Sequence, residues 1–499
     1  MELAEKKVAV VGLGVSNQPL IRFLARKGAR VTGCDRKSRE AFGEKAGVLA
    51  ELEKLGVGLR LGEGYLEGLG AFELIFLTPG MRRDLPEIEA AQRAGAVLSS
   101  EMRLFFSLCR APIIGITGSS GKTTTTTLLY EMLKAAGRQV HLGGNIGQVL
   151  IERVEEIPPE AAVIMELSSF QLQDFTQSPH IAVVTNVTPN HLDQHSSMEE
   201  YLEAKRNILR FQKPGDFAVL NLDNEVTREM AGGVKGGLMP FSRGQELKEG
   251  VFLRGDEIIC RWGRQVTQGS LNIPGASDGA IKEERICRAG ELKLLGTHNV
   301  ENVMAAAGAA ILAGVPVAAI RKVAATFRGV PHRLELVRRM NGVDYYNDSI
   351  ATSPARAMAG LRSFDRPVVL IAGGYDKHLP FDEFAEEVVG RVKTLVLVGV
   401  TTPLIEEAVR KAGARVASHA SINVAVNAAA GASRPGVPHD GQVGPAIVRC
   451  MTFAEAVRAA SAAAGPGDVV LLSPACASYD MFPNFEKRGE LFRELVNAL

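Results

Sequence analysis

The stretch Pro112-Ile-Ile-Gly-Ile-Thr-Gly-Ser-Ser-Gly-Lys-Thr123 decides the fold of this chain. Its apolar first half, Pro112 to Ile116, predicts a buried strand, and the residues from Thr124 to Ala136 predict a helix. A glycine-rich turn between a strand and a helix exposes backbone N–H groups at the positive end of the helix dipole, and such a turn binds phosphate. The sequence therefore predicts a phosphate-binding loop in a parallel α/β domain.

Two residues of this loop indicate that its ligand is ATP. Lys122 would place a positive charge on the β- and γ-phosphates, and the Thr123 hydroxyl would bind Mg²⁺. The common pattern has a glycine where Ile116 stands, so Gly118 would take that role in a shorter loop. An ordinary turn before a helix is the alternative. The loop residues expected to bind ATP are Gly118, Ser119, Ser120, Gly121, Lys122, Thr123 and Thr124.

Composition bounds the classes of function. The chain has 499 residues, a length typical of about three domains. Its formal net charge is +1, so no overall field favours nucleic acid or an anionic membrane. The six cysteines include no Cys-x-x-Cys pair, which favours reduced thiols in the cytoplasm, and no apolar stretch is long enough to span a membrane. We expect a cytoplasmic, monomeric protein that binds small molecules.

The order of expected elements predicts an α/β fold with three domains. Residues 1–100 alternate strand and helix as a Rossmann-like domain does, and residues 331–499 do the same. Residues 101–330 contain the phosphate loop and predict a central ATPase-like parallel sheet, with a β subsheet within 240–295. Residues 420–447 are rich in Ala, Gly, Pro and Asn, which predicts a mobile surface insertion.

The first domain carries part of a dinucleotide-binding pattern. Gly12-Leu-Gly-Val-Ser-Asn17 follows an expected strand, and Asp35 ends the next strand. Asn17 stands where the pattern has its third glycine. Three interpretations remain open: a nucleotide-diphosphate ligand, NAD, and a merely structural turn.

Three residues of the central domain are candidate metal ligands. Glu166 closes an apolar strand, and an acid at the carboxyl end of a parallel strand can hold Mg²⁺. His191 follows the next strand and would lie near Glu166. Lys205 lies on an expected helix, where most lysines are solvated. A surface acid and a hydrogen-bonded loop histidine are the alternatives for the other two.

Polar residues near the second linker could complete a nucleotide site. Asn299 and Asn302 lie three apart on one helical face, where their carboxamides could bind adenine or merely cap the helix. Arg333 stands at the linker between the second and third domains. An arginine in that place could contact phosphate when the domains close.

Three loops of the third domain, 347–352, 373–377 and 473–478, follow expected strands. The polar groups of 347–352 could hold a ribose or a carboxylate, and Lys377 would lie on the crevice side, although each loop alone could be a plain turn. No Gly-x-Ser-x-Gly elbow occurs in the chain, which argues against serine hydrolase chemistry.

In this order the motifs resemble the Mur ligase family of peptidoglycan synthesis, and the resemblance covers nearly the whole chain. The stretch Ser473-Pro-Ala-Cys-Ala-Ser-Tyr-Asp-Met-Phe-Pro-Asn-Phe-Glu-Lys-Arg-Gly-Glu-Leu-Phe492 is similar to the members that add D-glutamate. The resemblance implies an ATP-dependent ligase whose substrates are UDP-N-acetylmuramoyl-L-alanine and D-glutamate. It further implies an acyl-phosphate intermediate and two Mg²⁺ ions.

The resemblance also implies roles for single residues, of which Lys122, His191 and Lys205 would be catalytic. The residues implied for the UDP-sugar are Gly14, Val15, Ser16, Asp35, Thr78, Pro79, Gly80 and Asn145. Those implied for ATP beyond the loop are Asn299, Asn302, Arg333 and Asp348. Those implied for D-glutamate are Thr352, Lys377, Ser478 and Phe485. The implied metal ligands are Thr123 and Glu166 for one ion, and His191 and a carbamylated Lys205 for the other.

Ile350 departs from the family pattern, because some members carry lysine there. Two other classes of function stay open: an NAD-linked oxidoreductase, which leaves the phosphate loop unexplained, and a nucleotide-binding switch without chemistry. Within the ligase class, a sibling Mur ligase or a folylpolyglutamate synthase-like ligase is the alternative.

Overall fold

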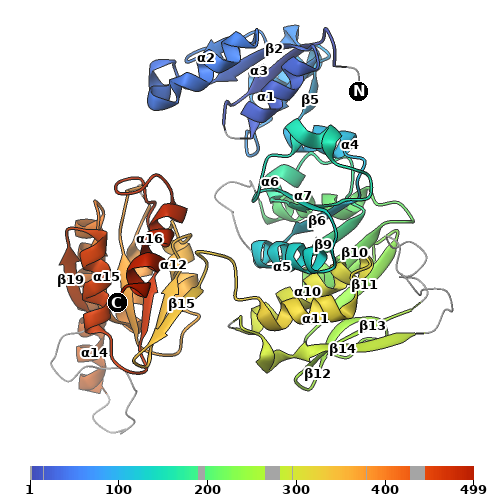
Figure 1. Ribbon diagram of the computed structural model, residues 1–499. Helices are drawn as coiled ribbons and strands as arrows, with labels where there is room; N and C mark the ends of the chain where they lie inside the picture. The colour runs from blue at the N-terminus through green and yellow to red at the C-terminus, as the bar shows by residue number, and fades with distance from the viewer. Residues whose placement is uncertain are drawn as a thin grey trace. The chain divides into compact units, whose positions relative to one another are not determined.

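The computed structural model describes residues 3–14, 16–188, 197–263, 281–294, 296–377, 379–426 and 444–499. The chain divides into two compact units, and each contains parallel sheet with helices packed on it (Figure 1). The first unit comprises Met1–Leu292 and Thr297–Phe327, and the second comprises Lys293–Gly296 and Arg328–Leu499. Three separate sheets confirm the predicted three-domain α/β fold.

The first sheet has five parallel strands in the order β3-β2-β1-β4-β5. Its order reverses between β1 and β4, and the loops that follow these two strands begin at Gly12 and Thr78. Ligands of doubly wound sheets bind at such a reversal. The strands are β1 Lys7–Val11, β2 Arg30–Asp35, β3 Gly58–Leu61, β4 Leu74–Leu77 and β5 Val97–Ser99, and the helices are α1 Asn17–Arg26, α2 Ala46–Lys54 and α3 Pro86–Arg93.

The central sheet has nine strands in the order β14-β13-β12-β11-β10-β9-β6-β8-β7. The strands from β6 to β12 pair in parallel, while β13 and β14 continue the same sheet through the antiparallel pairs β12–β13 and β13–β14. The predicted β subsheet is therefore one edge of this sheet. The strands are β6 Ile113–Thr117, β7 Val140–Gly144, β8 Ala162–Glu166, β9 Ile181–Val184, β10 Phe217–Asn221, β11 Gly237–Ser242, β12 Gly250–Arg254, β13 Glu257–Trp262 and β14 Lys282–Arg288.

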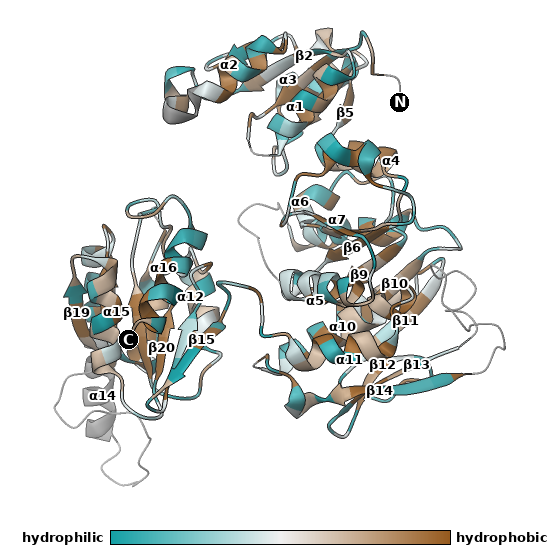
Figure 2. Ribbon diagram, in the orientation of Figure 1, coloured by the Kyte–Doolittle hydropathy of each residue, from teal (hydrophilic) through white to brown (hydrophobic). Residues whose placement is uncertain are grey.

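The strands at the middle of the central sheet are apolar along their whole length because both faces are covered. Every residue of β6, β8 and β9 is buried, and β6 and β9 are largely brown in Figure 2. The helices of this domain are α4 Glu101–Leu108, α5 Lys122–Ala135, α6 Ser169–Leu172, α7 Met198–Arg210, α8 Glu225–Ala231, α10 Thr297–Leu312 and α11 Val317–Thr326.

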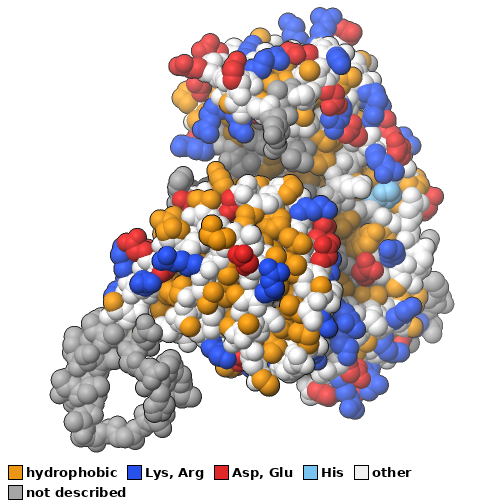
Figure 3. Space-filling view, turned by 60° about the vertical axis from the view of Figure 1, so that its left-hand side comes forward, with side chains coloured by type: hydrophobic (Ala, Val, Ile, Leu, Met, Phe, Trp, Pro, Cys, Tyr) orange, Lys and Arg blue, Asp and Glu red, His pale blue; other side chains and the backbone are white. Residues whose placement is uncertain are grey.

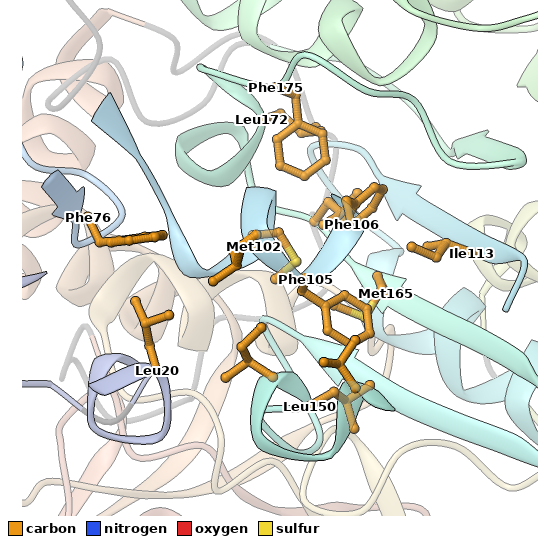
Figure 4. Packing of buried hydrophobic residues seen from close by; sticks show 14 of the residues in the cluster. Leu20, Phe76, Met102, Phe105, Phe106, Ile113, Leu150, Met165, Leu172 and Phe175 are labelled. Carbon is orange, nitrogen blue, oxygen red and sulfur yellow. The ribbon is translucent and has the colours of Figure 1, made fainter. Parts of the chain in front are cut away.

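Helix α4 joins the first two sheets through one apolar core (Figure 4). Its Met102 and Phe105 belong to the same buried cluster as Phe76 of β4 and Met165 of β8. Phe106 packs edge-on against Phe175, with ring centroids 4.9 Å apart. Burying a side chain of this size stabilises the fold by about 2–3 kcal/mol. The shared core explains why both sheets fall within one compact unit.

The second unit contains a six-stranded sheet in the order β15-β16-β20-β17-β18-β19, in which only β15 runs antiparallel. Because β16, β20 and β17 are parallel neighbours, the loops that follow them meet at one edge. The strands are β15 Glu335–Met340, β16 Val343–Asn347, β17 Val368–Ala372, β18 Val392–Val398, β19 Ala446–Cys450 and β20 Val469–Leu472. The helices are α12 Pro354–Leu361, α13 Asp382–Arg391, α14 Thr402–Val426, α15 Phe453–Ala463 and α16 Phe485–Asn497.

The predicted bounds of the surface insertion, 420–447, are wrong at both ends. Helix α14 continues to Val426, because its alanine-rich sequence favours a helix, and strand β19 begins at Ala446. The residues from 427 to 443 lie outside the described part. Among the helices that the structure describes, none combines the length and apolar character needed to cross a bilayer. Figure 3 shows acidic and basic side chains interspersed on one face, as the small net charge predicts.

Candidate active site

The loop between β6 and α5 requires glycine at two positions. Gly118 and Gly121 have φ angles of 149° and 83°. A Cβ on Gly118 would lie 2.0 Å from Thr185 Oγ1, and a Cβ on Gly121 would lie 2.1 Å from Asn302 Oδ1. The loop thus packs too closely on its neighbours to accept any side chain there, as a phosphate-binding turn does.

Lys122 begins α5 and turns back over the loop. Its Nζ donates to the carbonyl oxygens of Gly118 at 2.8 Å and Ser119 at 3.3 Å. The positive charge is therefore held above the loop backbone, at the place where the sequence predicts phosphate. Thr123 follows in the first helical turn and is partly exposed.

Asn186, in the segment that follows β9, holds the loop from its other side, a role that the sequence did not predict. Its side-chain Oδ1 accepts from Ser120 N at 3.0 Å, and its Nδ2 donates to Ser120 O at 3.2 Å. Its backbone oxygen accepts from Ser119 N at 2.8 Å. The carboxamide thus bonds both the N–H and the C=O of Ser120, which is the pairing that the backbone of a neighbouring strand would make. Its place just after β9 is the one signal in the sequence that could have indicated it.

Lys205 lies against the same loop, so the alternative of a solvated helix lysine is wrong. The residue is 1% exposed. Its Nζ donates to Gly118 O at 3.1 Å and to Thr117 Oγ1 at 3.4 Å, and lies 4.7 Å from the centre of the Tyr201 ring. Burial, together with the positive charge of Lys122, lowers the pKa of Lys205 to about 7. The Gly118 carbonyl thus accepts from two lysines.

Glu166 ends β8 as predicted and is only 1% exposed, which excludes a surface acid. Its Oε1 accepts from Asn145 Nδ2 at 3.0 Å, whereas its Oε2 has no hydrogen-bond partner among the described residues. A buried carboxylate oxygen without a partner suits a hard cation such as Mg²⁺.

The described residues contain no ready-made group of three or more His, Cys, Asp or Glu that could hold a metal. Mg²⁺ usually binds one or two protein groups and takes its other ligands from phosphates and water. Glu166 and the Thr123 hydroxyl fit that demand. His191 belongs to residues 189–196, which lie outside the described part.

Asn299 and Asn302 lie near the start of α10, beside the phosphate loop. Asn302 Nδ2 donates to Asn299 Oδ1 at 2.9 Å, and Thr125 Oγ1 donates to Asn302 Oδ1 at 3.4 Å. Because the Asn302 carboxamide packs on Gly121, helix α10 is fixed directly against the start of α5. Both asparagines therefore lie close to the phosphate loop, as the sequence predicts for a shared site.

Several of the residues predicted to bind the UDP-sugar lie in the loops that follow β1 and β4, at the reversal in the first sheet. Ser16, Thr78, Pro79 and Gly80 line one pocket, which Gly144 beside Asn145 also lines. Asp35 accepts from Leu13 N at 2.7 Å and Lys37 N at 2.9 Å, so it orders the loop after β1. Gly14 is exposed, and Val15 lies outside the described residues.

The same pocket contains residues that the sequence analysis missed. Gln171, Asp174 and Arg83 line it. The Arg83 guanidinium forms an ion pair with Asp174 at 2.6 Å, and the Asp174 side chain is 5% exposed. Asn17, which stands in place of the third glycine of the dinucleotide pattern, donates from its carboxamide to the Val11 and Gly12 carbonyls.

In the second unit, the three predicted loops meet at one edge of the sheet. Lys377 Nζ donates to Thr352 O at 3.2 Å, and Tyr375 N donates to Ala477 O at 2.9 Å. Ser478 is 2% exposed, and Phe485 begins α16 beside the same loops. Burial lowers the pKa of Lys377 from its ordinary value.

Asp348 is buried and linked to two segments. Its Oδ2 accepts from Ser473 Oγ at 2.8 Å, and its Oδ1 accepts from Leu334 N at 3.2 Å. Burial raises its pKa to about 7. Arg333 is exposed beside Leu334. Ile350 stands where some members of the family carry lysine, but another cation lies next to it: Arg356 Nη1 donates to the Ile350 carbonyl at 3.5 Å.

The first unit thus has the fold and the phosphate loop of a nucleotide-binding α/β enzyme. Three family models match the chain: the Mur ligase MurD-like N-terminal domain at residues 6–99, the Mur ligase middle domain at residues 116–310, and the Mur ligase glutamate ligase domain at residues 332–476. The chain belongs to the Mur ligase family.

Relatives of the chain are known over its full length. A UDP-N-acetylmuramoylalanine–D-glutamate ligase of Symbiobacterium thermophilum is 51% identical over 497 residues, which cover 99% of this chain and 98% of the relative. A protein of the same name from Acetivibrio thermocellus is 46% identical, with 100% and 97% covered. The solved UDP-N-acetylmuramate-alanine ligase of Thermotoga maritima is 18% identical with a TM-score of 0.51, covers 99% of this chain and 100% of its own, and supports the fold.

Proposed function

We propose that this chain is an ATP-dependent ligase that joins D-glutamate to UDP-N-acetylmuramoyl-L-alanine in peptidoglycan synthesis. The observation that carries the proposal is the 51% identity, over nearly all of both chains, to a relative named for that reaction. The phosphate loop with Lys122 supports the use of ATP, and the loops at Thr352, Lys377 and Ser478 provide a separate place for an amino acid.

The chemistry follows from the difficulty of forming an amide in water. The carboxylate of the L-alanyl end attacks the γ-phosphorus of ATP, which yields ADP and an acyl phosphate. The amine of D-glutamate then attacks the acyl carbon, phosphate leaves, and the amine loses a proton. Both partners of the first step are anions, so Lys122 offsets their repulsion by holding the phosphates.

Glu166 and Thr123 are the residues we assign to Mg²⁺, which supplies charge neutralisation at the phosphates when bound. We assign a second ion to His191 and a carbamylated Lys205. Carbamylation joins the neutral Lys205 amine to CO₂ and releases one proton. A pKa of about 7 supports this assignment because only the neutral amine reacts. The product is anionic, so it would attract Lys122 instead of repelling it.

The remaining assignments belong to the same proposal. Gly14, Val15, Ser16, Asp35, Thr78 to Gly80 and Asn145 bind the UDP-sugar. Asn299, Asn302, Arg333 and Asp348 bind ATP, and Thr352, Lys377, Ser478 and Phe485 bind D-glutamate. We place the domains at 1–100, 101–330 and 331–499, which is supported by the first sheet ending at Ser99 and by the main segment of the second unit, Arg328–Leu499. We propose a cytoplasmic monomer, which the six free thiols suit.

One assay tests the reaction. Phosphate release is measured with ATP, Mg²⁺ and UDP-N-acetylmuramoyl-L-alanine, and D-glutamate is compared with L-glutamate, L-lysine and diaminopimelate. We expect release only with D-glutamate. Release with another amino acid instead would favour a sibling ligase, and release indifferent to the amino acid would refute the proposal.

A further inference from the structure

Arg488, on the first turns of α16, is one of the largest fully buried side chains in the second unit. Only 1% of the residue is exposed, and no carboxylate of the described residues lies within ion-pair distance of it. A buried cation without an anionic partner is costly and is retained only where polar groups surround it. The partners of its guanidinium therefore indicate what it does.

All three nitrogens of the guanidinium donate to backbone or hydroxyl oxygens. Nε donates to Ser349 Oγ at 3.0 Å, and Nη2 donates to Ser349 O at 2.9 Å. Nη2 also donates to Cys476 O at 3.1 Å, and Nη1 donates to Ala477 O at 3.2 Å. The Ala477 carbonyl also accepts from Tyr375 N at 2.9 Å, which links the third loop to the same oxygen. The guanidinium thus binds the loops that follow β16 and β20 directly, and the loop that follows β17 is joined to them through the Ala477 carbonyl.

The loop after β20 has a backbone conformation that needs such support. Ala475 has a φ of 58°, a region that residues with a side chain rarely adopt. The carbonyls of the next two residues, Cys476 and Ala477, both accept from Arg488. An unusual backbone persists where neighbouring contacts over-determine it. Arg488 provides those contacts.

We propose that Arg488 is the positioning residue that holds these three loops in register for the amino acid substrate. The inference rests on the proposed function, since it takes D-glutamate as the ligand of Thr352, Lys377 and Ser478. Lysine could not replace it, because a single ammonium cannot donate to four oxygens in a fixed fork. Because Arg488 is buried and all three of its guanidinium nitrogens donate to protein oxygens, its effect passes through the loops.

The test compares Arg488→Lys with Arg338→Lys. Arg338 is a matched control because its Nη1 also donates to carbonyls of α16 and its end, those of Val496 at 2.9 Å and Asn497 at 3.1 Å, but at the far end of the helix. We expect Arg488→Lys to raise KM for D-glutamate at least tenfold while KM for ATP stays within twofold. Arg338→Lys should leave both constants within twofold. An unchanged KM for D-glutamate, or an equal rise in both constants, would overturn the proposal.

A second readout does not depend on activity. Amide hydrogen exchange should quicken together in peptides covering 347–352, 373–377 and 473–478 of Arg488→Lys, and not in α15. If that variant does not fold, Ser349→Ala takes its place, since it removes the Nε partner, and a threefold or larger rise in KM for D-glutamate is expected. Unchanged exchange in all three peptides would refute the proposal. If phosphate release by the unsubstituted enzyme does not depend on D-glutamate, the proposed function is refuted. The hydrogen-exchange measurement would still decide whether Arg488 holds the loops.

Discussion

Each unit of this chain buries one cation close to its candidate site: Lys205 on α7 in the first unit and Arg488 on α16 in the second. Each residue is 1% exposed, and neither has a carboxylate within ion-pair distance among the described residues. Lys205 has two oxygen acceptors and a pKa lowered to about 7. Arg488 has four hydrogen bonds, and burial lowers its pKa only to about 10.

The difference in pKa between the two side chains decides what each can do in a buried site. At neutral pH a large fraction of Lys205 is a neutral amine, which can react with CO₂ and reverse the sign of its charge. Arg488 stays charged, and its planar fork fixes backbone that would otherwise be free to move. The region around the phosphate loop is therefore suited to chemistry, and the region around α16 to positioning.

The substitution Lys205→Arg should have the largest effect. The guanidinium that it introduces would remain a cation and could not form a carbamate, so we expect kcat to fall about a thousandfold. Lys205→Ala should be equally inactive but partly rescued by short-chain carboxylic acids, which can supply the missing anion. Steady-state phosphate release measures both. Activity near that of the parent in either variant would contradict the carbamate.

Glu166→Gln should have the second largest effect. The change removes the charge from the buried oxygen that we assign to Mg²⁺, so the Mg²⁺ concentration for half-maximal activity should rise about 10- to 100-fold. Titration with Mg²⁺ at saturating ATP measures it. Glu160→Gln, an exposed acid just before the other end of β8, is the control and should leave the titration unchanged. Equal behaviour of the two variants would remove Glu166 from the metal site.

The lowered pKa of Lys205 makes stability depend on pH. Between about 7 and the ordinary value of 10.5, the unfolded chain holds a proton on this amine that the folded chain has released. The free energy of unfolding therefore gains from this group as pH rises through that window, by at most about 1.4 kcal/mol per pH unit. In CO₂-free buffer, Lys205→Met should exceed the parent in stability near pH 7, and its advantage should shrink toward pH 10. Urea unfolding at several pH values measures the difference, and a constant advantage would show that Lys205 is charged throughout.

The smallest effect is expected for Arg338→Met, which sharpens the contrast with Arg488. Loss of two hydrogen bonds to carbonyls at the end of α16 should lower the free energy of unfolding by about 1–2 kcal/mol. The KM for D-glutamate should not change, because these contacts lie far along α16 from the acceptor loops. Urea unfolding and phosphate release measure the two quantities. A large rise in the KM for D-glutamate would mean that losing any hydrogen bond to α16 disturbs the acceptor loops, so that Arg488 would have no special role.

The sequence predicted the architecture well because its signals are local. The apolar run Pro112 to Ile116 forms a strand that is shifted by one residue, Ile113–Thr117, and Glu166 closes β8 as predicted. The phosphate loop was predicted from its glycines and Lys122. The helix after the loop begins two residues earlier than predicted, at Lys122, because Gly121 in its left-handed conformation is the residue that precedes the helix.

The sequence did not reveal contacts between distant segments. Lys205 looked like any helix lysine, although it donates to Gly118, 87 residues away. Tyr201 lies four residues before Lys205 and therefore on the same face of α7. An aromatic residue at that spacing is the one sequence feature that could have indicated a buried Lys205. Asn186 and Arg488 act through backbone carbonyls and amides, which no residue pattern encodes. Such roles become visible only when the strands are assembled.

The most direct test of the claim that the two cations differ is carbon-13 NMR of the enzyme in labelled bicarbonate near pH 8. We predict one carbamate carbonyl resonance that Lys205→Met abolishes and Lys377→Met retains. No carbamate signal, or a signal that survives Lys205→Met, would contradict the account.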